Sequence, residues 1–178
     1  MMDRLRRWSG PVRLLHWVMA ALLVALIAVG WVMTHSQYDL GTTFALYQWH
    51  KSYGLLVLPL LALRLAARLS PRPPALEHSR IERVGARIAH LAFYLLMLAL
   101  PVCGWLMASA SPLSLPTRPF DLFTMPSLVA PDEALFERLR LLHEILAYAL
   151  LALLGLHVAA ALKHQFFDRD GVIRRITF

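Results

Sequence analysis

Four long apolar runs divide the chain, and each is separated from the next by a polar or proline-rich segment. The helices that we expect from these runs cover residues of about 11–34, 44–69, 81–108 and 139–164. A helix needs about 20 mostly apolar residues to cross the hydrocarbon core of a bilayer, so each run is long enough to span it. The pattern predicts an all-α integral membrane protein, a four-helix bundle that residues 1–178 form as a single domain.

Breaker residues support these limits. Ser9-Gly10-Pro11 precedes the first run, and this combination is typical of a helix start. The second run ends at Ser70-Pro71-Arg72-Pro73-Pro74, which cannot continue a helix. The proline-rich connection 109–138 is too long for a tight turn, and we expect it to fold over one end of the bundle. The first run is too long for a signal peptide and lacks a small-residue cleavage site.

The composition agrees with a membrane protein, because 58% of the residues are hydrophobic and only 16% are charged. A net charge of +7 fits basic residues that flank apolar runs, and it does not indicate nucleic acid as a partner. The single cysteine, Cys103, excludes an internal disulfide. No CxxCH motif is present, so a covalently attached c-type haem is excluded and any haem must be held by ligation and packing.

The basic residues predict the orientation. All but four of the 18 Lys and Arg residues fall on one side of the expected bundle. The four on the other side are Lys51, Arg118, Arg138 and Arg140. Because the side richer in Lys and Arg faces the cytoplasm, both termini are expected to be cytoplasmic.

Five of the eight histidines fall within the expected spans, where ionisable side chains are costly and usually functional. These five are His16, His50, His90, His143 and His157. A single one of them would be explained equally well as a hydrogen-bonded contact between helices. His143 and His157, however, lie within about 40° of one helix face and about 21 Å apart along its axis. One helix therefore presents two histidines at different depths.

The other helices match these two depths. His50 lies near the outer start of the second helix, as His143 does in the fourth, whereas His16 and His157 both lie near the cytoplasmic side. The depths therefore predict the pairs His50 with His143 and His16 with His157. Neutral imidazole is a good axial ligand of haem iron, and two imidazoles leave no open coordination position. We expect two such haems, which move electrons and do not bind oxygen.

Other histidine sites fit this pattern less well. Zinc, copper or nickel need ligands that converge within a few ångströms, whereas these pairs are separated by most of the bilayer. A proton or metal transporter is a further class, but four helices without a repeat or a carboxylate ladder fit it poorly. Gly54 and Gly155, close to histidines, could give a flat porphyrin room; close helix packing explains them equally well.

Several segments resemble the bacterial cytochrome b561 family. They are Leu15-His16-Trp17, Trp49-His50-Lys51, residues 90–94 with 99–101, Thr124-Met125-Pro126, and His143-Glu144 through Gly155-Leu156-His157 to His164. The resemblance covers nearly the whole chain and is specific in its histidine spacing. It implies two non-covalent haem b groups, a quinone partner and a multi-pass location in the bacterial inner membrane. In one branch of that family it also implies oxidation of superoxide, with the electrons passed to ubiquinone.

On this interpretation the protein is an oxidoreductase that oxidises periplasmic superoxide and reduces ubiquinone at the cytoplasmic side. Lys51 and Arg140 would attract superoxide to the outer haem, although anchoring at the interface or pairing with haem propionates explains both equally well. His164 and His90 are candidate quinone contacts, or else interfacial and interhelical polar residues. The alternative is a cytochrome b subunit that takes electrons from a periplasmic hydrogenase, dehydrogenase or carrier protein through the connection 109–138.

Overall fold

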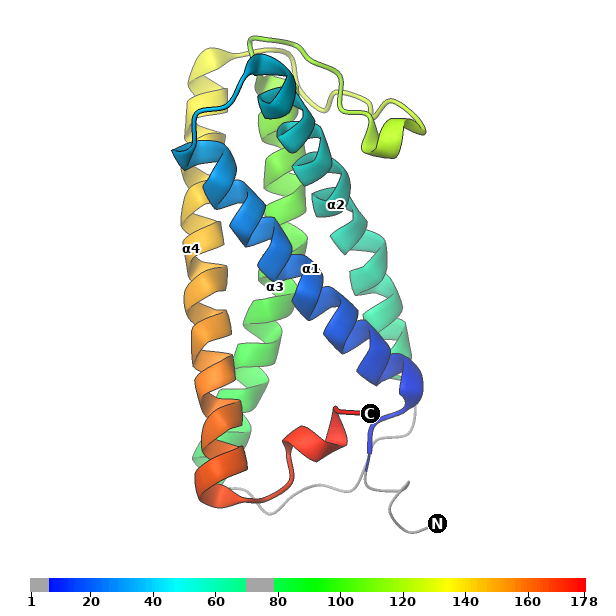
Figure 1. The fold of residues 1–178 in the computed structure, drawn as a ribbon, viewed down its shortest axis with the longest axis vertical. Helices are drawn as coiled ribbons and strands as arrows, with labels where there is room; N and C mark the ends of the chain where they lie inside the picture. The colour runs from blue at the N-terminus through cyan, green and yellow to red at the C-terminus, as the bar shows by residue number, and fades with distance from the viewer. Residues whose placement is uncertain (1–6, 70–78) are drawn as a thin grey trace.

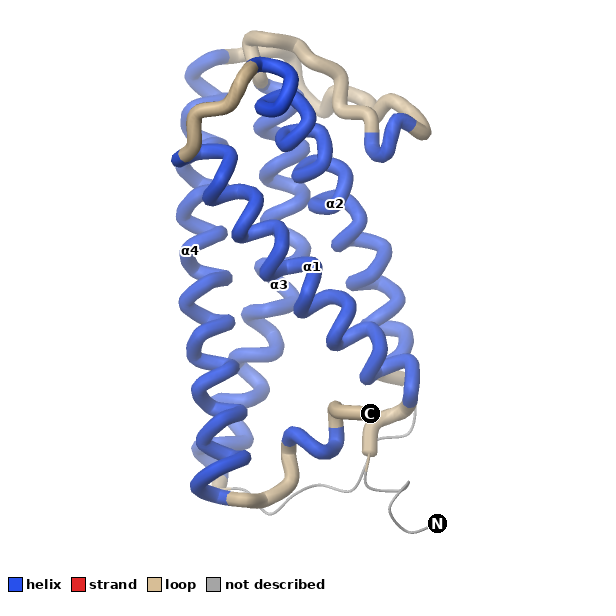
Figure 2. The backbone as a smooth tube through the Cα atoms, viewed as in Figure 1, coloured by secondary structure: helices blue, strands red, loops and turns tan. Residues whose placement is uncertain are grey.

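The computed structural model describes residues 7–69 and 79–178, and within these ranges it contains helices and loops but no strand. The four long helices are α1 (Gly10–His35), α2 (Leu40–Ala67), α3 (Arg80–Ala110) and α4 (Glu133–Lys163). A short helical turn, Pro119–Asp121 (η2), lies between α3 and α4, and two more, His164–Asp168 (η3) and Ile173–Arg175 (η4), come after α4 (Figures 1 and 2). The predicted all-α membrane bundle is confirmed.

Three segments of the described chain are long and apolar enough to cross a membrane: Gly10–His35, Arg80–Ala110 and Glu133–Asp168. The remaining long helix, α2, has 28 residues, so its length also suffices. Its first half is more polar, with Gln48, His50 and Lys51 close together. This polar half lowers its hydropathy relative to the other three helices.

The helices pack mainly in chain order: α1 against α2, α2 against α3, and α3 against α4. Figure 1 shows α1 crossing the front of the bundle obliquely, so that its end overlaps α4 at the top of the view and its start lies near the end of α2 at the bottom. α1 and α4 thus diverge along the bundle. Where these two helices are farther apart, contact between them depends on side chains, such as those of His16 and His157.

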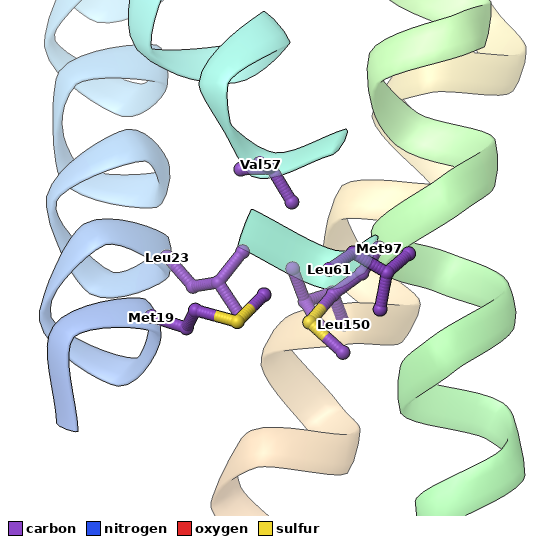
Figure 3. Packing of buried hydrophobic residues seen from close by; sticks show 6 residues of the cluster. All are labelled: Met19, Leu23, Val57, Leu61, Met97 and Leu150. Atoms are coloured by element: carbon purple, nitrogen blue, oxygen red, sulfur yellow. The ribbon is translucent and has the colours of Figure 1, made fainter. Parts of the chain in front are cut away.

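A small apolar core lies at the middle of the bundle and includes residues of all four helices (Figure 3). Its buried members are Met19, Leu23, Val57, Leu61, Met97 and Leu150. Leu150 lies halfway along α4 between His143 and His157. Most other large apolar side chains are exposed, as expected where lipid rather than water surrounds the helices.

Two helices begin earlier than the apolar pattern predicts, because aspartate caps lie outside the apolar runs. Asp39 accepts a hydrogen bond from the backbone N–H of Thr42 (3.0 Å), so α2 begins at Leu40. The Thr42 bonds also hold the pKa of the Asp39 carboxyl below its ordinary value. Asp132 accepts from the backbone N–H of Leu135 (2.8 Å), so α4 begins at Glu133.

Both ends of the described chain meet at one end of the bundle, which we call the terminal end. The Trp8 N–H donates to the Arg175 carbonyl (3.0 Å), and Trp17 Nε1 donates to the Ile176 carbonyl (3.0 Å). The guanidinium of Arg13 donates to the Thr177 carbonyl (2.9 Å). The segment after α4 is thereby held against the start of α1, as Figure 1 also shows.

The opposite end, which we call the loop end, is covered by the connection between α3 and α4. Buried Ser52 of α2 accepts a hydrogen bond from the Phe120 N–H (3.0 Å). Trp105 of α3 donates to the Pro126 carbonyl (3.0 Å), and Ser109 accepts from the Leu128 N–H (3.2 Å). The connection therefore folds over the bundle end and is fixed to two helices.

Candidate functional site

His50 of α2 and His143 of α4 face each other near the loop end. Their ring centres are 6.3 Å apart and the ring planes meet at 71°. Nδ1 of each ring is buried without a hydrogen bond of good geometry among the described residues, although the backbone of Leu100 lies close to His143. A buried ring nitrogen without a partner is unusual in a folded protein.

A glycine of a third helix lies against each of these rings. A Cβ atom on Gly30 of α1 would lie 3.4 Å from Cε1 of His50, and one on Gly104 of α3 would lie 3.3 Å from Cε1 of His143. Sequence reasoning missed both glycines. It considered Gly54 and Gly155 instead, around which a Cβ would meet no described atom within 4 Å.

Three histidines meet at the terminal end. The rings of His16 (α1) and His157 (α4) have centres 6.3 Å apart and planes at 60°. The ring of His90 (α3) is 6.4 Å from that of His157, at 61°. Phe93 lies edge-on to His157 at 5.3 Å. His157 therefore has two imidazole neighbours at almost equal distance, of which only His16 was predicted as its partner.

Each helix contributes one residue to each of these levels, always 14 residues apart in sequence. The loop-level group comprises Gly30, His50, Gly104 and His143. The terminal-level group comprises His16, Arg64, His90 and His157, with Arg64 included because its Nη2 lies 3.1 Å from His16 Nδ1. Fourteen residues are close to four whole helical turns, so both positions share one helix face.

A model of the prokaryotic cytochrome b561 family matches residues 7–178. The chain belongs to this family. Cytochrome b561 homolog 2 of Escherichia coli K12 is 35% identical over 164 residues, which cover 90% of this chain and 86% of that protein. A probable superoxide oxidase CybB of Yersinia pestis is 30% identical over 169 residues, covering 91% and 90%. Cytochrome b561 homolog 1 of E. coli K12 is 25% identical, covering 97% of each.

As a member of the cytochrome b561 family, the protein binds haem b and transfers electrons across a membrane. The histidine geometry fits that group. Two metal–imidazole bonds of about 2 Å each on opposite sides of one iron, plus half of each ring, put the ring centres about 6 Å apart. The pairs His50–His143 and His16–His157 both have this separation. His90–His157 has it too, so distance alone does not select the partner of His157.

His164, a predicted quinone contact, lies in a carboxylate cluster at the start of the segment after α4. Its Nδ1 is 2.6 Å from Asp170 Oδ2 and 3.1 Å from Asp168 Oδ2. Donor atoms of Glu82, His164 and Asp168 come within 4.8 Å of one another, a spacing that suits a cation. Lys163 already pairs with Asp168 (2.6 Å) and Glu82 (3.2 Å), so an ammonium group occupies the position that such a cation would take.

The two predicted superoxide-attracting residues differ in their surroundings. Lys51 is half-buried beside His50 at the loop end, and no carboxylate among residues 7–69 and 79–178 forms an ion pair with it. Arg140 pairs with Glu137 (2.8 Å) and with Glu144 (3.6 Å), and 52% of its side chain is exposed. Its charge is thereby largely compensated, so Lys51 contributes more to any attraction of an anion.

Proposed function

We propose that the protein transfers electrons across the inner membrane through two haem b groups, one held by His50 and His143 and one by His16 and His157. The observation that carries this proposal is the pair of 6.3 Å ring separations, at two levels of one bundle. Haem b, when bound, supplies reversible one-electron transfer. Residues 1–178 act as a single unit in this proposal, because all four helices contribute to both levels.

His16 is proposed to bind the terminal-level haem together with His157. His90 is then a polar neighbour at the same level and not a ligand. The resemblance of Leu15-His16-Trp17 to the family's first helix favours His16. His90 then has an imidazole free to bind or protonate a quinone that approaches the terminal level. His164, with its two carboxylates, is proposed to exchange protons with the solvent at the same end.

The proposed reaction is the oxidation of periplasmic superoxide coupled to ubiquinone reduction at the cytoplasmic side. Two superoxide anions give two O2 molecules and two electrons, which reduce one ubiquinone to ubiquinol with uptake of two protons. The similarity to a probable superoxide oxidase supports this choice of donor. So does Lys51, whose positive charge beside His50 would draw a small anion to the loop end.

A second candidate function is electron uptake from a periplasmic hydrogenase, dehydrogenase or carrier protein. The feature that favours it is the apolar surface of the connection between α3 and α4, where Leu113 (75%), Leu122 (77%) and Phe123 (55%) are exposed. Such residues suit a protein contact. This candidate shares the haems and the quinone side and differs only in the donor.

One experiment separates these candidates. Reduced-minus-oxidised spectra and a pyridine haemochrome assay of the purified protein give the number of b haems, and superoxide is then added with and without ubiquinone. Two haems per chain that superoxide reduces and ubiquinone reoxidises are expected. Two haems that do not react with superoxide would favour a protein donor, and a protein without haem would contradict the proposal as a whole.

A further inference from the structure

Arg64 in the last turn of α2 and Arg68, the residue that caps its end, lie one turn apart and half-buried at the terminal level. Their contacts are with neutral groups. Arg64 Nη2 is 3.1 Å from His16 Nδ1, and its side chain hydrogen-bonds Tyr94. The Arg68 guanidinium lies over the rings of Tyr94 (5.5 Å) and Trp8 (5.8 Å).

Within the part of the chain that the structure describes, this arrangement gives the two positive charges no counter-charge. No carboxylate among residues 7–69 and 79–178 forms an ion pair with either arginine. Like charges four residues apart on a helix repel each other, and an arginine in a membrane span is costly unless it is paired. Both side chains contact the same group, Tyr94, so one anion placed near them would compensate both charges.

Metal binding at His16 would release Arg64 for such an anion. A guanidinium only donates hydrogen bonds, so its contact with Nδ1 requires a lone pair there. A neutral imidazole that binds iron through Nε2 carries its proton on Nδ1, and two donors cannot share a hydrogen bond. The guanidinium then has to turn to another acceptor, and its planar fork is suited to a carboxylate or phosphate.

We propose that Arg64 and Arg68 form an anion-binding site at the terminal level, which takes the two carboxylates of the haem held by His16 and His157. The phosphate of an anionic lipid has the same chemistry and is the other possible source of the anion. The inference rests on the proposed haem at this level. It adds a binding role for two residues whose positive charge is otherwise explained by membrane orientation alone.

The test is a redox titration of the purified holoprotein and of its Arg64→Gln and Arg68→Gln variants. Loss of a guanidinium leaves the carboxylates uncompensated, which stabilises ferric iron, so the terminal-level haem should have a lower midpoint potential. The component lost in His16→Ala identifies that haem, and the loop-level haem should not change. Arg87→Gln is the matched control, because Arg87 is an exposed arginine of α3 at the same end.

Lipid composition distinguishes the two sources. In nanodiscs of phosphatidylcholine alone and with added phosphatidylglycerol, haem carboxylates predict the same difference between wild type and Arg64→Gln. The phosphate of a lipid with net negative charge predicts a difference only with phosphatidylglycerol, because the choline group of phosphatidylcholine compensates its own phosphate. If wild type and Arg64→Gln have the same potential in each of the two lipids, or if Arg87→Gln shifts as much as Arg64→Gln, the site is overturned.

A variant that loses the haem is also informative. If Arg64→Gln lacks the terminal-level haem, its recovery in Arg64→Lys supports a charge role, whereas continued loss in Arg64→Lys overturns it in favour of packing. A wild-type protein without any b haem would instead contradict the proposed function, so the two failures are distinguishable.

Discussion

At the scale of single residues, the rings of His50 and His143 need room, and two glycines of neighbouring helices provide it. Gly30 and Gly104 allow α1 and α3 to approach the rings of His50 and His143 so closely that a methyl group would be at 3.4 Å and 3.3 Å. These rings therefore rest on backbone, which cannot move aside as a flexible side chain can. The orientation of the two imidazoles is set by helices that carry neither of them.

Gly104→Ala is expected to disturb the loop-level haem selectively. The added methyl group has to displace the His143 ring by a few tenths of an ångström, and overpacking of this kind costs about 1–3 kcal/mol. We expect a changed EPR signal and midpoint potential for that haem alone. Gly54→Ala is the matched control, since a Cβ there meets no described atom within 4 Å. Identical spectra for Gly104→Ala and wild type would contradict a positioning role.

The ligand assignment predicts separate losses. His50→Ala and His143→Ala should each remove the loop-level haem and leave the other, so haem content measured by pyridine haemochrome falls by about half. Two haems retained in His143→Ala would refute the pairing.

The terminal level has its own discriminating pair of variants. His16→Ala should lose the terminal-level haem, whereas His90→Ala should keep it and lose reoxidation by ubiquinone. The reverse result would make His90 the ligand, which its 6.4 Å separation from His157 would also accommodate.

At the scale of helices, the sequence predicts what is local and misses what depends on how helices are rotated. Four spans and the depths of His16, His50, His143 and His157 follow from hydropathy and a rise of about 1.5 Å per residue. The contacts of Gly30, Gly104 and Arg64 depend on the crossing of neighbouring helices, which no local pattern contains. A signal was nonetheless present, because each of these residues lies 14 positions from a histidine of its own helix.

The start of α4 offers a test at this scale. Asp132 caps the helix through the N–H of Leu135, ahead of the apolar run. Asp132→Ala should therefore lower stability by about 1 kcal/mol, measured by thermal unfolding in detergent followed by circular dichroism. Asp132→Asn keeps an acceptor and should behave like wild type. Equal unfolding of all three proteins would show that the connection, and not the cap, fixes this helix start.

At the scale of the whole molecule, the core that contains Met19, Leu61 and Leu150 separates the two histidine levels. The bundle is thus organised as two polar levels with an apolar layer between them. An apolar layer of this kind excludes water and ions from the middle of the membrane while it keeps the two levels in fixed relation. Electrons can cross such a layer over a short distance, whereas protons need polar groups that this layer does not provide.

The charge distribution predicts how the molecule lies in the membrane. A green fluorescent protein fused after Phe178 should fluoresce, whereas alkaline phosphatase fused there should be inactive, because both termini are expected in the cytoplasm. Conversely, Leu122→Cys in the loop-end connection should react with a membrane-impermeant thiol reagent added to intact spheroplasts. Active phosphatase at the C-terminal fusion would reverse the proposed orientation.

The bond between Arg13 and the Thr177 carbonyl joins residues 164 positions apart. At about 5–20 residues per second, the ribosome makes Thr177 roughly 10–30 s after Arg13. During that interval α1 is already in the membrane without the partner that fixes its first turn, and His16 waits for His157 as well. The terminal level is consequently the last of the two levels to be completed, and the haem proposed to lie between His16 and His157 could be enclosed only after synthesis has passed through α4.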